Sequence, residues 1–370
     1  MIRALQPIRD AFAGRYRLHD ELGRGTMATV FAADGVGGER LAIKVLHREI
    51  VAALGPDRFQ REVDLLSRLR HPRIVPVLDS GAVGPYLYLV MPYVPGETLR
   101  VRLERSGPLP LDAVLGVAAD VADALDCAHR ERIIHRDIKP ENLLLDEGRA
   151  QVCDFGLARA LGEAALEPVS SSGLVIGTPA YMSPEQAMGR DDLGPASDIY
   201  SLGCVVYEML AGELPFTGPT PQAVIARHVA ERPRPLRTVR ADLPRRVEAA
   251  VLAALDKSPE RRPATGAAFV AALAGGASRG HPLLRGNATR DVAQLRFPCA
   301  MLSPAKTSTR APRSVPPGSS DRQGLNGGGG GAGGRPGPPG SHFRMTRTRS
   351  RLTRIFHACC FRSHFFRLAI

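Results

Sequence analysis

Short stretches with apolar residues, punctuated by glycines, predict strands in the first hundred residues, as in an antiparallel meander. The strands predicted in this way cover residues 16–23, 28–33, 40–46 and 86–93. Between them, Phe59, Val63 and Leu66 recur at spacings of three and four residues and predict an amphipathic helix over residues 57–70.

After residue 111 the apolar residues follow helical spacing instead. One long apolar stripe runs from Val114 to Leu125, and two further helices are predicted over residues 199–210 and 247–255. The pattern therefore predicts a small β-rich part followed by a larger helical part, joined near residues 92–96. A cleft between two such parts is a common place for a ligand.

Positive charge is concentrated toward the C-terminal end of the chain. The 370 residues include 49 Lys and Arg against 37 Asp and Glu, which gives a formal net charge of +12. Residues 277–370 contain 16 of these bases and two of these acids, so the first 276 residues are near neutral. This distribution argues against a globular nucleic-acid-binding domain, and nucleic acid is not an expected partner of the first 276 residues.

Residues 276–370 have the composition of a low-complexity basic tail, which we expect to be disordered. Residues 324–340 hold ten glycines and three prolines, and residues 342–370 hold seven arginines and no acid. Three explanations stay open: a disordered linker ending in an amphipathic segment for anionic lipid headgroups, a docking peptide, or the out-of-frame translation of a GC-rich gene. Membrane association is expected only through this tail.

Cysteine usage and the N-terminal sequence predict a cytoplasmic protein. The six cysteines show neither a disulfide framework nor the spacing of zinc ligands, which fits a reducing compartment. The first residues lack the apolar core of a signal peptide, and no run is long and apolar enough for a membrane span.

Two weak motifs lie in the predicted strands. Residues 22–30 (Leu-Gly-Arg-Gly-Thr-Met-Ala-Thr-Val) place two glycines where the backbone can approach phosphates closely, although plain turn chemistry explains the same pattern. Lys44 lies inside an apolar strand, where a lysine usually sits at an edge with its ammonium in water. The chain has four lysines against 45 arginines, so a lysine here favours a role that a planar guanidinium cannot fill, such as bridging two phosphates.

The strongest motif covers residues 135–142 (His-Arg-Asp-Ile-Lys-Pro-Glu-Asn) and is followed by Asp-Phe-Gly at residues 154–156. Its aspartate and lysine bring opposite charges together in a turn that a proline shapes. Asn142 and Asp154 supply oxygen ligands of the kind that Mg²⁺ prefers. A solvated charged loop would explain any one of these residues, but not all of them in this order.

Taken in order, these motifs resemble those of eukaryotic-type (Hanks-type) protein kinases, and specifically of the bacterial serine/threonine protein kinases. Ser-Pro-Glu at 183–185 and Ser-Asp-Ile-Tyr-Ser-Leu-Gly at 197–203 continue the series, and the resemblance covers residues 14–275. It implies an α+β, bilobal protein-kinase fold. The expected parts are a small β-rich N-lobe (about 14–91), a hinge (about 92–96) and a larger helical C-lobe (about 97–275).

The resemblance implies ATP as the phosphate donor and Mg²⁺ (or Mn²⁺) as the metal ion. Asp137 would orient the acceptor hydroxyl and accept its proton, and Lys139 would steady the γ-phosphate. Asn142 and Asp154 would hold the metal ion. A lysine at position 139 is the pattern of serine/threonine kinases rather than of tyrosine kinases.

The resemblance also implies a set of ATP-binding residues. Lys44 would hold the α- and β-phosphates with Glu62 as its partner on the first helix, and the alternative partner, Asp64, would point to another face. Because Pro92 has no N–H, the hinge donor would be the N–H of Val94. The other residues expected to cover the nucleotide are Leu22, Gly23, Gly25, Val30, Ala42, Met91 and Leu144.

Regulation is implied by Arg136, a cation beside the catalytic aspartate that the family pairs with a phosphate on the activation segment, residues 154–185. Ser170 and Ser172 are the expected autophosphorylation sites, although a flexible spacer would explain these serines too. Phosphorylation in trans would use a homodimer. Thr178 would hydrogen-bond the catalytic loop.

Three further residues are expected to anchor the fold. Glu185 and Arg262 should form a buried ion pair that holds the activation segment to the C-lobe. Asp198 should hydrogen-bond the backbone of residues 135–137.

The expected function is that of an ATP:protein serine/threonine phosphotransferase, a transferase acting on the Ser and Thr hydroxyls of protein substrates. Two alternatives stay open: a pseudokinase scaffold that binds ATP without turnover, and an adaptor whose basic tail binds nucleic acid or anionic membrane. Pseudokinases typically lose Lys44, Asp137 or Asp154, and all three are present.

Overall fold

The computed structural model describes residues 2–155 and 179–275, which all belong to one compact unit. Ser170, Ser172 and Thr178 lie outside the described residues, as does the predicted tail 276–370. Within the described ranges, no helix combines the length and the apolar character that a membrane span requires.

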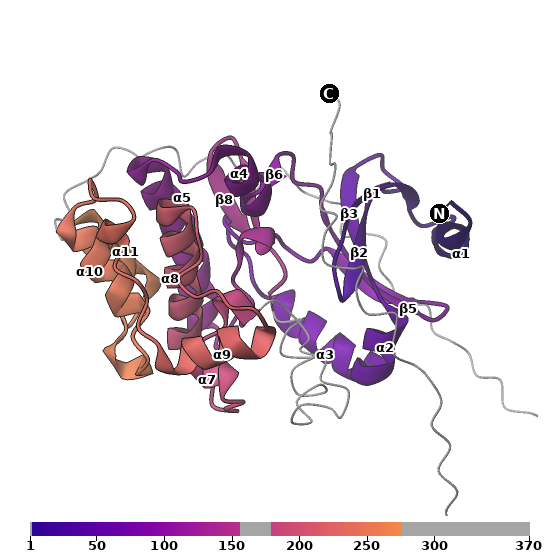
Figure 1. The fold of residues 1–370 in the computed structure, drawn as a ribbon. Helices are drawn as coiled ribbons and strands as arrows, with labels where there is room; N and C mark the ends of the chain where they lie inside the picture. Colours follow the sequence, from indigo (N-terminus) through magenta and orange to yellow (C-terminus); the bar gives the residue numbers. More distant parts are fainter. Residues whose placement is uncertain (1, 156–178, 276–370) are drawn as a thin grey trace, which may run out of the picture. The chain divides into compact units, whose positions relative to one another are not determined.

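The N-lobe contains a five-stranded antiparallel sheet with the strand order β1-β2-β3-β5-β4 (Figure 1). Its strands are β1 (Arg17–Arg24), β2 (Ala28–Asp34), β3 (Arg40–Leu46), β4 (Asp79–Val83) and β5 (Tyr86–Pro92). Four of them coincide with the predicted strands. The fifth, β4, has the short sequence Asp-Ser-Gly-Ala-Val and was not predicted; it forms as an edge strand by pairing with β5.

The strand register determines which side chains share the inner face of this sheet. Val30 lies opposite Lys44, and Lys44 lies opposite Leu89. Ala42 lies opposite Met91 in the same way. Because paired residues point to the same side of a sheet and alternate residues share a face, these five side chains lie on one face. Lys44 contacts the C-lobe, so this is the face that borders the candidate site.

The opposite face of the sheet belongs to a core that includes α1 (Ile2–Phe12), a helix that was not predicted from the sequence. Phe12 is 1% exposed and lies edge-on to Tyr88, with the ring centroids 4.8 Å apart. The buried residues of this core also include Leu18, Phe31, Ala33, Leu41, Ile43, Val45 and Val90. Phe12 therefore completes the N-lobe core, although it precedes the predicted boundary at residue 14.

Two helices, α2 (Arg48–Leu54) and α3 (Pro56–Leu66), pack with the inner face of the sheet in a second core. On α3, the apolar residues that predict the helix are buried, and Glu62 is buried beside them. The prediction extended this helix to residue 70, but the chain leaves it at Ser67, shortly before Pro72, which cannot continue a helix.

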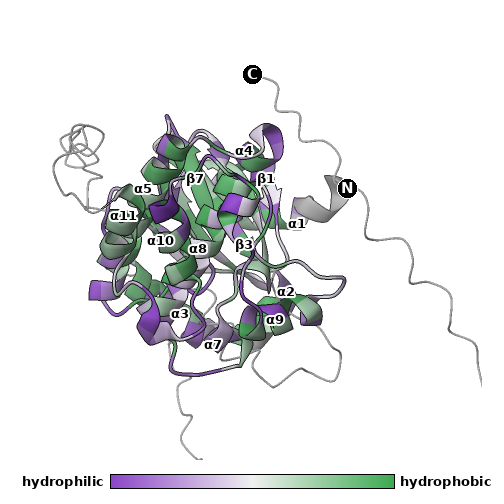
Figure 2. Cartoon of the chain, turned by 60° about the vertical axis from the view of Figure 1, so that its left-hand side comes forward, coloured by the Kyte–Doolittle hydropathy of each residue, from purple (hydrophilic) through white to green (hydrophobic). Residues whose placement is uncertain are grey.

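The C-lobe is mainly helical and contains the long helices α5 (Leu111–Arg130) and α8 (Pro195–Ala211). Every residue of α8 from Ser197 to Leu210 is buried, which explains why this helix is apolar on more than one face. In Figure 2, hydrophobic colouring gathers around α8 and β7, whereas hydrophilic colouring marks peripheral helices and turns.

Shorter elements surround these two helices. The remaining α-helices of residues 2–155 and 179–275 are α4 (Leu99–Ser106), α7 (Pro184–Ala187), α9 (Pro221–Ala230), α10 (Arg245–Ala254) and α11 (Gly266–Ala274). The 3-10 helices are η1 (Pro140–Asn142), η2 (Pro179–Tyr181), η3 (Leu236–Thr238) and η4 (Pro259–Arg261). A small antiparallel sheet contains β6 (Glu97–Thr98), β7 (Leu143–Asp146) and β8 (Arg149–Val152).

The hairpin of β7 and β8 positions the two halves of the strongest sequence motif. β7 begins directly after Asn142, and β8 ends two residues before Asp154. The connecting residues, Glu147 and Gly148, have φ values of 48° and 78°, which is the backbone of a tight two-residue hairpin turn. The turn therefore brings residues 142 and 154 to the same end of the hairpin.

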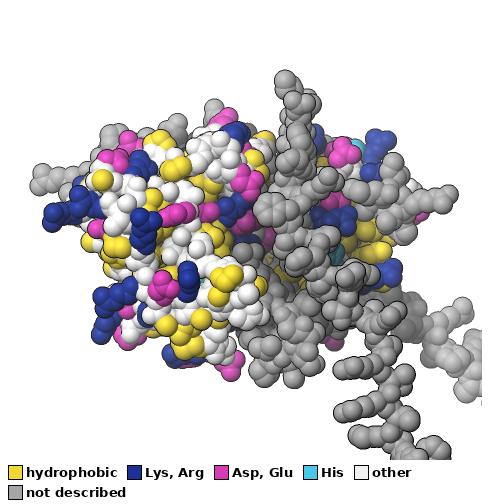
Figure 3. Space-filling view, viewed as in Figure 1, with side chains coloured by type: hydrophobic (Ala, Val, Ile, Leu, Met, Phe, Trp, Pro, Cys, Tyr) yellow, Lys and Arg dark blue, Asp and Glu magenta, His cyan; other side chains and the backbone are white. Residues whose placement is uncertain are grey.

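Charge on the visible described surface of the C-lobe is mixed. Figure 3 shows basic and acidic side chains interspersed there, rather than one continuous basic face. This distribution agrees with the near-neutral balance of the first 276 residues.

Candidate active site

A buried carboxylate holds the turn at residues 135–137. Asp198, on α8, is fully buried and accepts hydrogen bonds from the backbone N–H groups of His135 and Arg136, each at 2.8 Å. Arg136 has a φ of 68°, a left-handed conformation that a non-glycine residue keeps only when its surroundings hold it. The contact expected of Asp198 is thus present, and it fixes the direction in which Asp137 leaves the turn.

Three side chains expected to be catalytic meet at Asp137. Lys139 Nζ donates to Asp137 Oδ2 at 2.6 Å. Asn142 Nδ2 donates to the same oxygen at 3.0 Å and to the Asp137 carbonyl at 2.8 Å. The Asp137 side chain is 34% exposed, so its carboxylate remains accessible to an incoming hydroxyl.

Asp154 forms the second charged centre of the site. Its carboxylate accepts the ammonium of Lys44, with Nζ and Oδ2 2.7 Å apart. Burial acts to raise the pKa of this carboxyl, but the Lys44 ammonium outweighs it and holds the pKa below its ordinary value. Asp154 has a φ of 66°, a second left-handed non-glycine residue in the site. The carboxylate is therefore ionised at neutral pH and aimed by a strained backbone.

Glu62, the expected partner of Lys44, lies on α3 and is 8% exposed. The Lys44 ammonium pairs with Asp154, and its three N–H groups leave room for a second acceptor. The Lys44–Glu62 pair therefore stays a prediction, whereas the burial of Glu62 agrees with its predicted place on the helix.

The glycine loop leaves open space beside it. A Cβ at Gly23 would meet no atom of the described chain within 4 Å, and one at Gly25 would only touch the Ala28 carbonyl at 3.9 Å. Leu22 is 40% exposed next to them. Leu144, on β7 in the C-lobe, is half-buried. The loop therefore has room for bulky phosphates, as the expected role requires.

The hinge presents free backbone groups. β5 ends at Pro92, and Tyr93 donates its N–H to the Arg40 carbonyl at 3.1 Å. Within the described chain, the backbone N–H and C=O of the half-buried Val94 make no hydrogen bond. Buried backbone groups are normally paired, so this N–H is available as a donor to a ligand.

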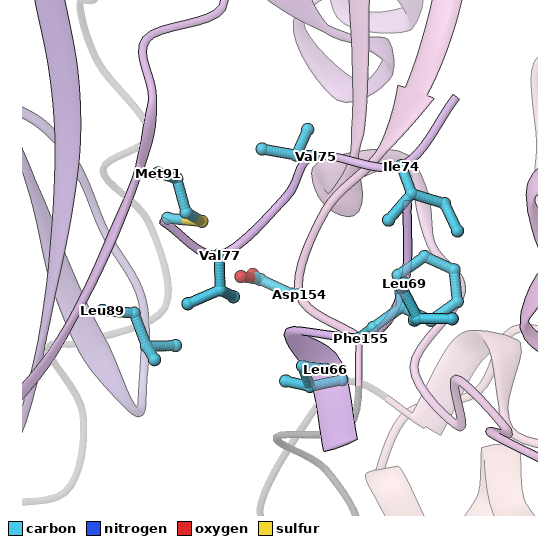
Figure 4. Close-up of a pocket in the computed structure, with 9 residues that line it drawn as sticks. All are labelled: Leu66, Leu69, Ile74, Val75, Val77, Leu89, Met91, Asp154 and Phe155. Carbon is cyan, nitrogen blue, oxygen red and sulfur yellow. The ribbon is translucent and has the colours of Figure 1, made fainter. Parts of the chain in front are cut away.

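A small pocket lies between the two lobes, with walls from both of them (Figure 4). It is lined by Leu66, Leu69, Ile74, Val75, Val77, Leu89, Met91, Asp154 and Phe155. Figure 4 shows the Asp154 carboxylate pointing toward Val77, whereas the Phe155 ring lies beside Leu69. The Phe155 ring also packs edge-on against His135, with centroids 4.5 Å apart. Met91, one of the residues expected to cover the nucleotide, thus lines the same pocket as Asp154 and Phe155.

The oxygen atoms of Asn142 and Asp154 fit a divalent cation. Cys153 donates its N–H to the Asn142 carbonyl at 3.0 Å, which places Asp154 next to Asn142. The Asn142 amide nitrogen is used by Asp137, and the amide oxygen makes no hydrogen bond within the described residues. A carboxylate and an amide oxygen beside a phosphate site are suitable Mg²⁺ ligands.

The expected anchor between Glu185 and Arg262 is present. Arg262 donates to both carboxylate oxygens of Glu185, at 2.6 and 2.8 Å, and the two side chains are 0% and 6% exposed. Burial acts to raise the pKa of Glu185, but hydrogen bonds from Arg262 and Ser197 lower it below its ordinary value. The pair is therefore charged at neutral pH.

A second, partly buried network is absent from the sequence-based expectations. Arg100, on α4, donates to Glu208 at 2.7 Å, to Glu141 at 3.0 Å and to the hydroxyl of Tyr181. Tyr181 also donates to Glu208 at 2.5 Å, and burial together with Glu208 raises the pKa of its hydroxyl. Its members are 27 to 108 residues apart, so no local pattern reveals them. The network ties η2 to the catalytic loop.

Comparison with known proteins agrees with this geometry. The family model described as "Protein kinase domain" matches residues 16–270. The serine/threonine-protein kinase PknB of Mycobacterium leprae is 42% identical over 268 residues, which are 70% of this chain and 42% of that protein. The serine/threonine-protein kinase pkn2 of Myxococcus xanthus is 39% identical over 269 residues, which are 70% of this chain and 32% of that protein. The chain thus spans less than half the length of these curated relatives.

Among solved structures, the crystal structure of Rad53 1-466 in complex with AMP-PNP superposes with a TM-score of 0.59 at 25% sequence identity. The match covers 76% of this chain and 68% of that chain. The α+β, bilobal fold expected from the sequence is therefore confirmed for the described residues. The chain belongs to the protein kinase domain family.

Proposed function

We propose that this chain is an ATP:protein serine/threonine phosphotransferase. The observation that carries the proposal is the pairing of two charged centres: Asp137 with Lys139 and Asn142, and Asp154 with Lys44. Phosphoryl transfer requires mainly positioning and charge neutralisation, and these five side chains supply both. The names of the curated relatives, which are serine/threonine-protein kinases, support the same acceptor class.

Some of these residues act on the acceptor hydroxyl and others on the phosphates of the donor. The Asp137 carboxylate orients the hydroxyl of the acceptor and receives its proton. The acceptor oxygen bonds to the γ-phosphorus of ATP while the bond from that phosphorus to the ADP oxygen breaks, and ADP leaves. Lys139 and Lys44 place positive charge where phosphate oxygens become more negative. ATP is the proposed donor, and Asn142 and Asp154 would hold a Mg²⁺ ion that neutralises charge on its phosphates.

We also propose that the chain phosphorylates its own activation segment at Ser170 and Ser172. Both serines lie outside the described residues, and the proposal depends on their spacing from Thr178 and on the arginine beside Asp137. Mass spectrometry of the active chain after incubation with Mg²⁺ and ATP should find phosphate on one or both serines. An active chain that stays unmodified over residues 163–178 would contradict this proposal.

The kinase proposal is tested by mixing the full chain with Mg²⁺, radiolabelled ATP and myelin basic protein. The wild type should label the acceptor, and Lys44→Met and Asp154→Asn should lower the rate by about 100-fold or more. Arg245→Met, which changes an exposed cation on α10, serves as the matched control and should keep full activity. ATP binding by the wild type without transfer would instead support a pseudokinase scaffold.

A further inference from the structure

Lys257 takes no part in the proposed reaction. Its ammonium contacts three hydrogen-bond acceptors. Its ammonium donates to the backbone carbonyl of His228 at 2.7 Å, to the hydroxyl of Tyr200 at 3.3 Å and to the carbonyl of Arg227 at 3.5 Å. The same nitrogen lies 4.2 Å from the centroid of the Phe216 ring. A compact ammonium can direct three N–H groups from one point, which a planar guanidinium cannot do.

The partners of Lys257 are themselves buried and linked. His228 and Tyr200 are both 0% exposed, and Tyr200 Oη lies 2.9 Å from His228 Nδ1. Because Lys257 donates to the Tyr200 oxygen, the Tyr200 hydroxyl is free to donate to His228 Nδ1, which keeps this imidazole neutral. Burial and the charge of Lys257 lower the pKa of His228 to about 4, in agreement with a neutral ring.

Helix α9 depends on this cluster for its position. The helix runs from Pro221 to Ala230, and His228 is its one fully buried residue. Hydrophobic burial therefore contributes less to holding α9 than to holding α8. The two carbonyls that Lys257 contacts belong to the last turn of α9, where a cation also interacts favourably with the helix dipole. Lys257 thus holds the C-terminal end of α9 against the rest of the C-lobe.

Helix α9 lies next to η2 and α7, and α7 contacts the catalytic loop. α9 packs against η2 and α7. On α7, Gln186 donates to the Arg136 carbonyl at 2.7 Å, one residue before Asp137. Tyr200 also packs under the Arg262 guanidinium, 4.9 Å from its ring centroid, and Arg262 pairs with α7 through Glu185. Helix α7 therefore links α9 to the backbone of the turn that carries Asp137.

We propose that Lys257 is a positioning residue for the protein acceptor: through His228 and Tyr200 it holds α9 beside η2 and so forms one wall of the acceptor's path to Asp137. This inference rests on the proposed kinase function. Lys257 touches neither Lys44, Asp137 nor Asp154, so its effect falls on acceptor binding and leaves the handling of ATP unchanged.

The test compares full-length Lys257→Met with the wild type, using myelin basic protein as the acceptor. The KM for the acceptor should rise by about fivefold or more, whereas kcat, the KM for ATP and ATP hydrolysis without acceptor should stay within about twofold. Tyr200→Phe removes a single hydroxyl from the cluster and keeps the ring, so it should raise the acceptor KM in the same direction. Arg245→Met is again the control.

The outcomes separate the two proposals. A wild type that transfers no phosphate to protein would overturn both the proposed function and this inference. An active wild type with unchanged acceptor KM in Lys257→Met and Tyr200→Phe would overturn this inference alone. Parallel losses of acceptor phosphorylation and ATP hydrolysis in Tyr200→Phe would also overturn it, because a general loss of structure would explain them.

Discussion

Replacing Glu185 by glutamine tests whether its ion pair with Arg262 stabilises the C-lobe. Glu185→Gln keeps the shape of the side chain but removes the charge, and it leaves the Arg262 guanidinium fully buried without its counterion. Breaking a buried pair from one side is costly because the remaining charge is cut off from water, and measured losses are about 3–5 kcal/mol. We therefore expect the free energy of unfolding to fall by about that amount.

Urea unfolding followed by far-UV circular dichroism measures this loss, and it suits a chain without tryptophan. The double variant Glu185→Gln/Arg262→Met should be less destabilised than the sum of the two single variants by about 1–3 kcal/mol, because neither charge remains unpaired. Asp192→Asn, in an exposed ion pair with Arg190, is the control and should leave the urea midpoint unchanged.

The pH dependence follows from the lowered pKa of Glu185. A carboxyl whose pKa is lower in the folded than in the unfolded state stabilises the fold above its ordinary pKa of 4.5. This contribution is lost as the pH falls through the folded pKa, so the difference between wild type and Glu185→Gln should shrink in acid. At neutral pH, a difference below about 0.5 kcal/mol between the free energies of unfolding of the wild type and Glu185→Gln would refute the reasoning. A difference that small is typical of exposed surface substitutions.

Two further predictions concern stability. Burial and the neighbouring lysine lower the pKa of His228 from 6.5 to about 4, so the free energy of unfolding should fall as the pH drops between these values. In urea titrations, His228→Gln should make this dependence on pH weaker. The same dependence on pH in the variant and the wild type would contradict the prediction. Gly96 has a φ of 116°, and a Cβ there would lie 2.0 Å from the Leu145 carbonyl oxygen, so Gly96→Ala should lower stability by at least about 1–3 kcal/mol. The control Gly116→Ala, on α5 with open space around it, should stabilise by up to about 1 kcal/mol, and equal effects of the two changes would count against the steric argument.

Local patterns predicted the elements whose residues carry the signal themselves. Short stretches punctuated by glycines located four strands of the N-lobe sheet, and most residues of β2, β3 and β5 are buried. The residues of the Asp137 cluster were predictable because they lie within six positions of one another along the chain. In both cases the residues that carry the signal lie close together along the chain.

The features that were not predicted depend on long-range packing. The Arg100 network joins four elements, and nothing in the residues around Arg100 indicates Glu208, which is 108 positions away. The ion pair between Lys44 and Asp154 joins residues 110 positions apart, and no local pattern around either residue indicates it. Helix α1 belongs to the N-lobe through Phe12, whose burial against Tyr88 no local pattern shows.

The central claim is that Asp137 directs a serine or threonine hydroxyl to the terminal phosphate of ATP. Its most direct test is the phosphoamino-acid content of myelin basic protein after incubation with radiolabelled ATP and either the wild type or Asp137→Asn. We predict phosphoserine or phosphothreonine with the wild type and a rate lower by about 10²–10⁴-fold with Asp137→Asn. Equal rates for the two proteins, or phosphotyrosine as the product, would contradict the account.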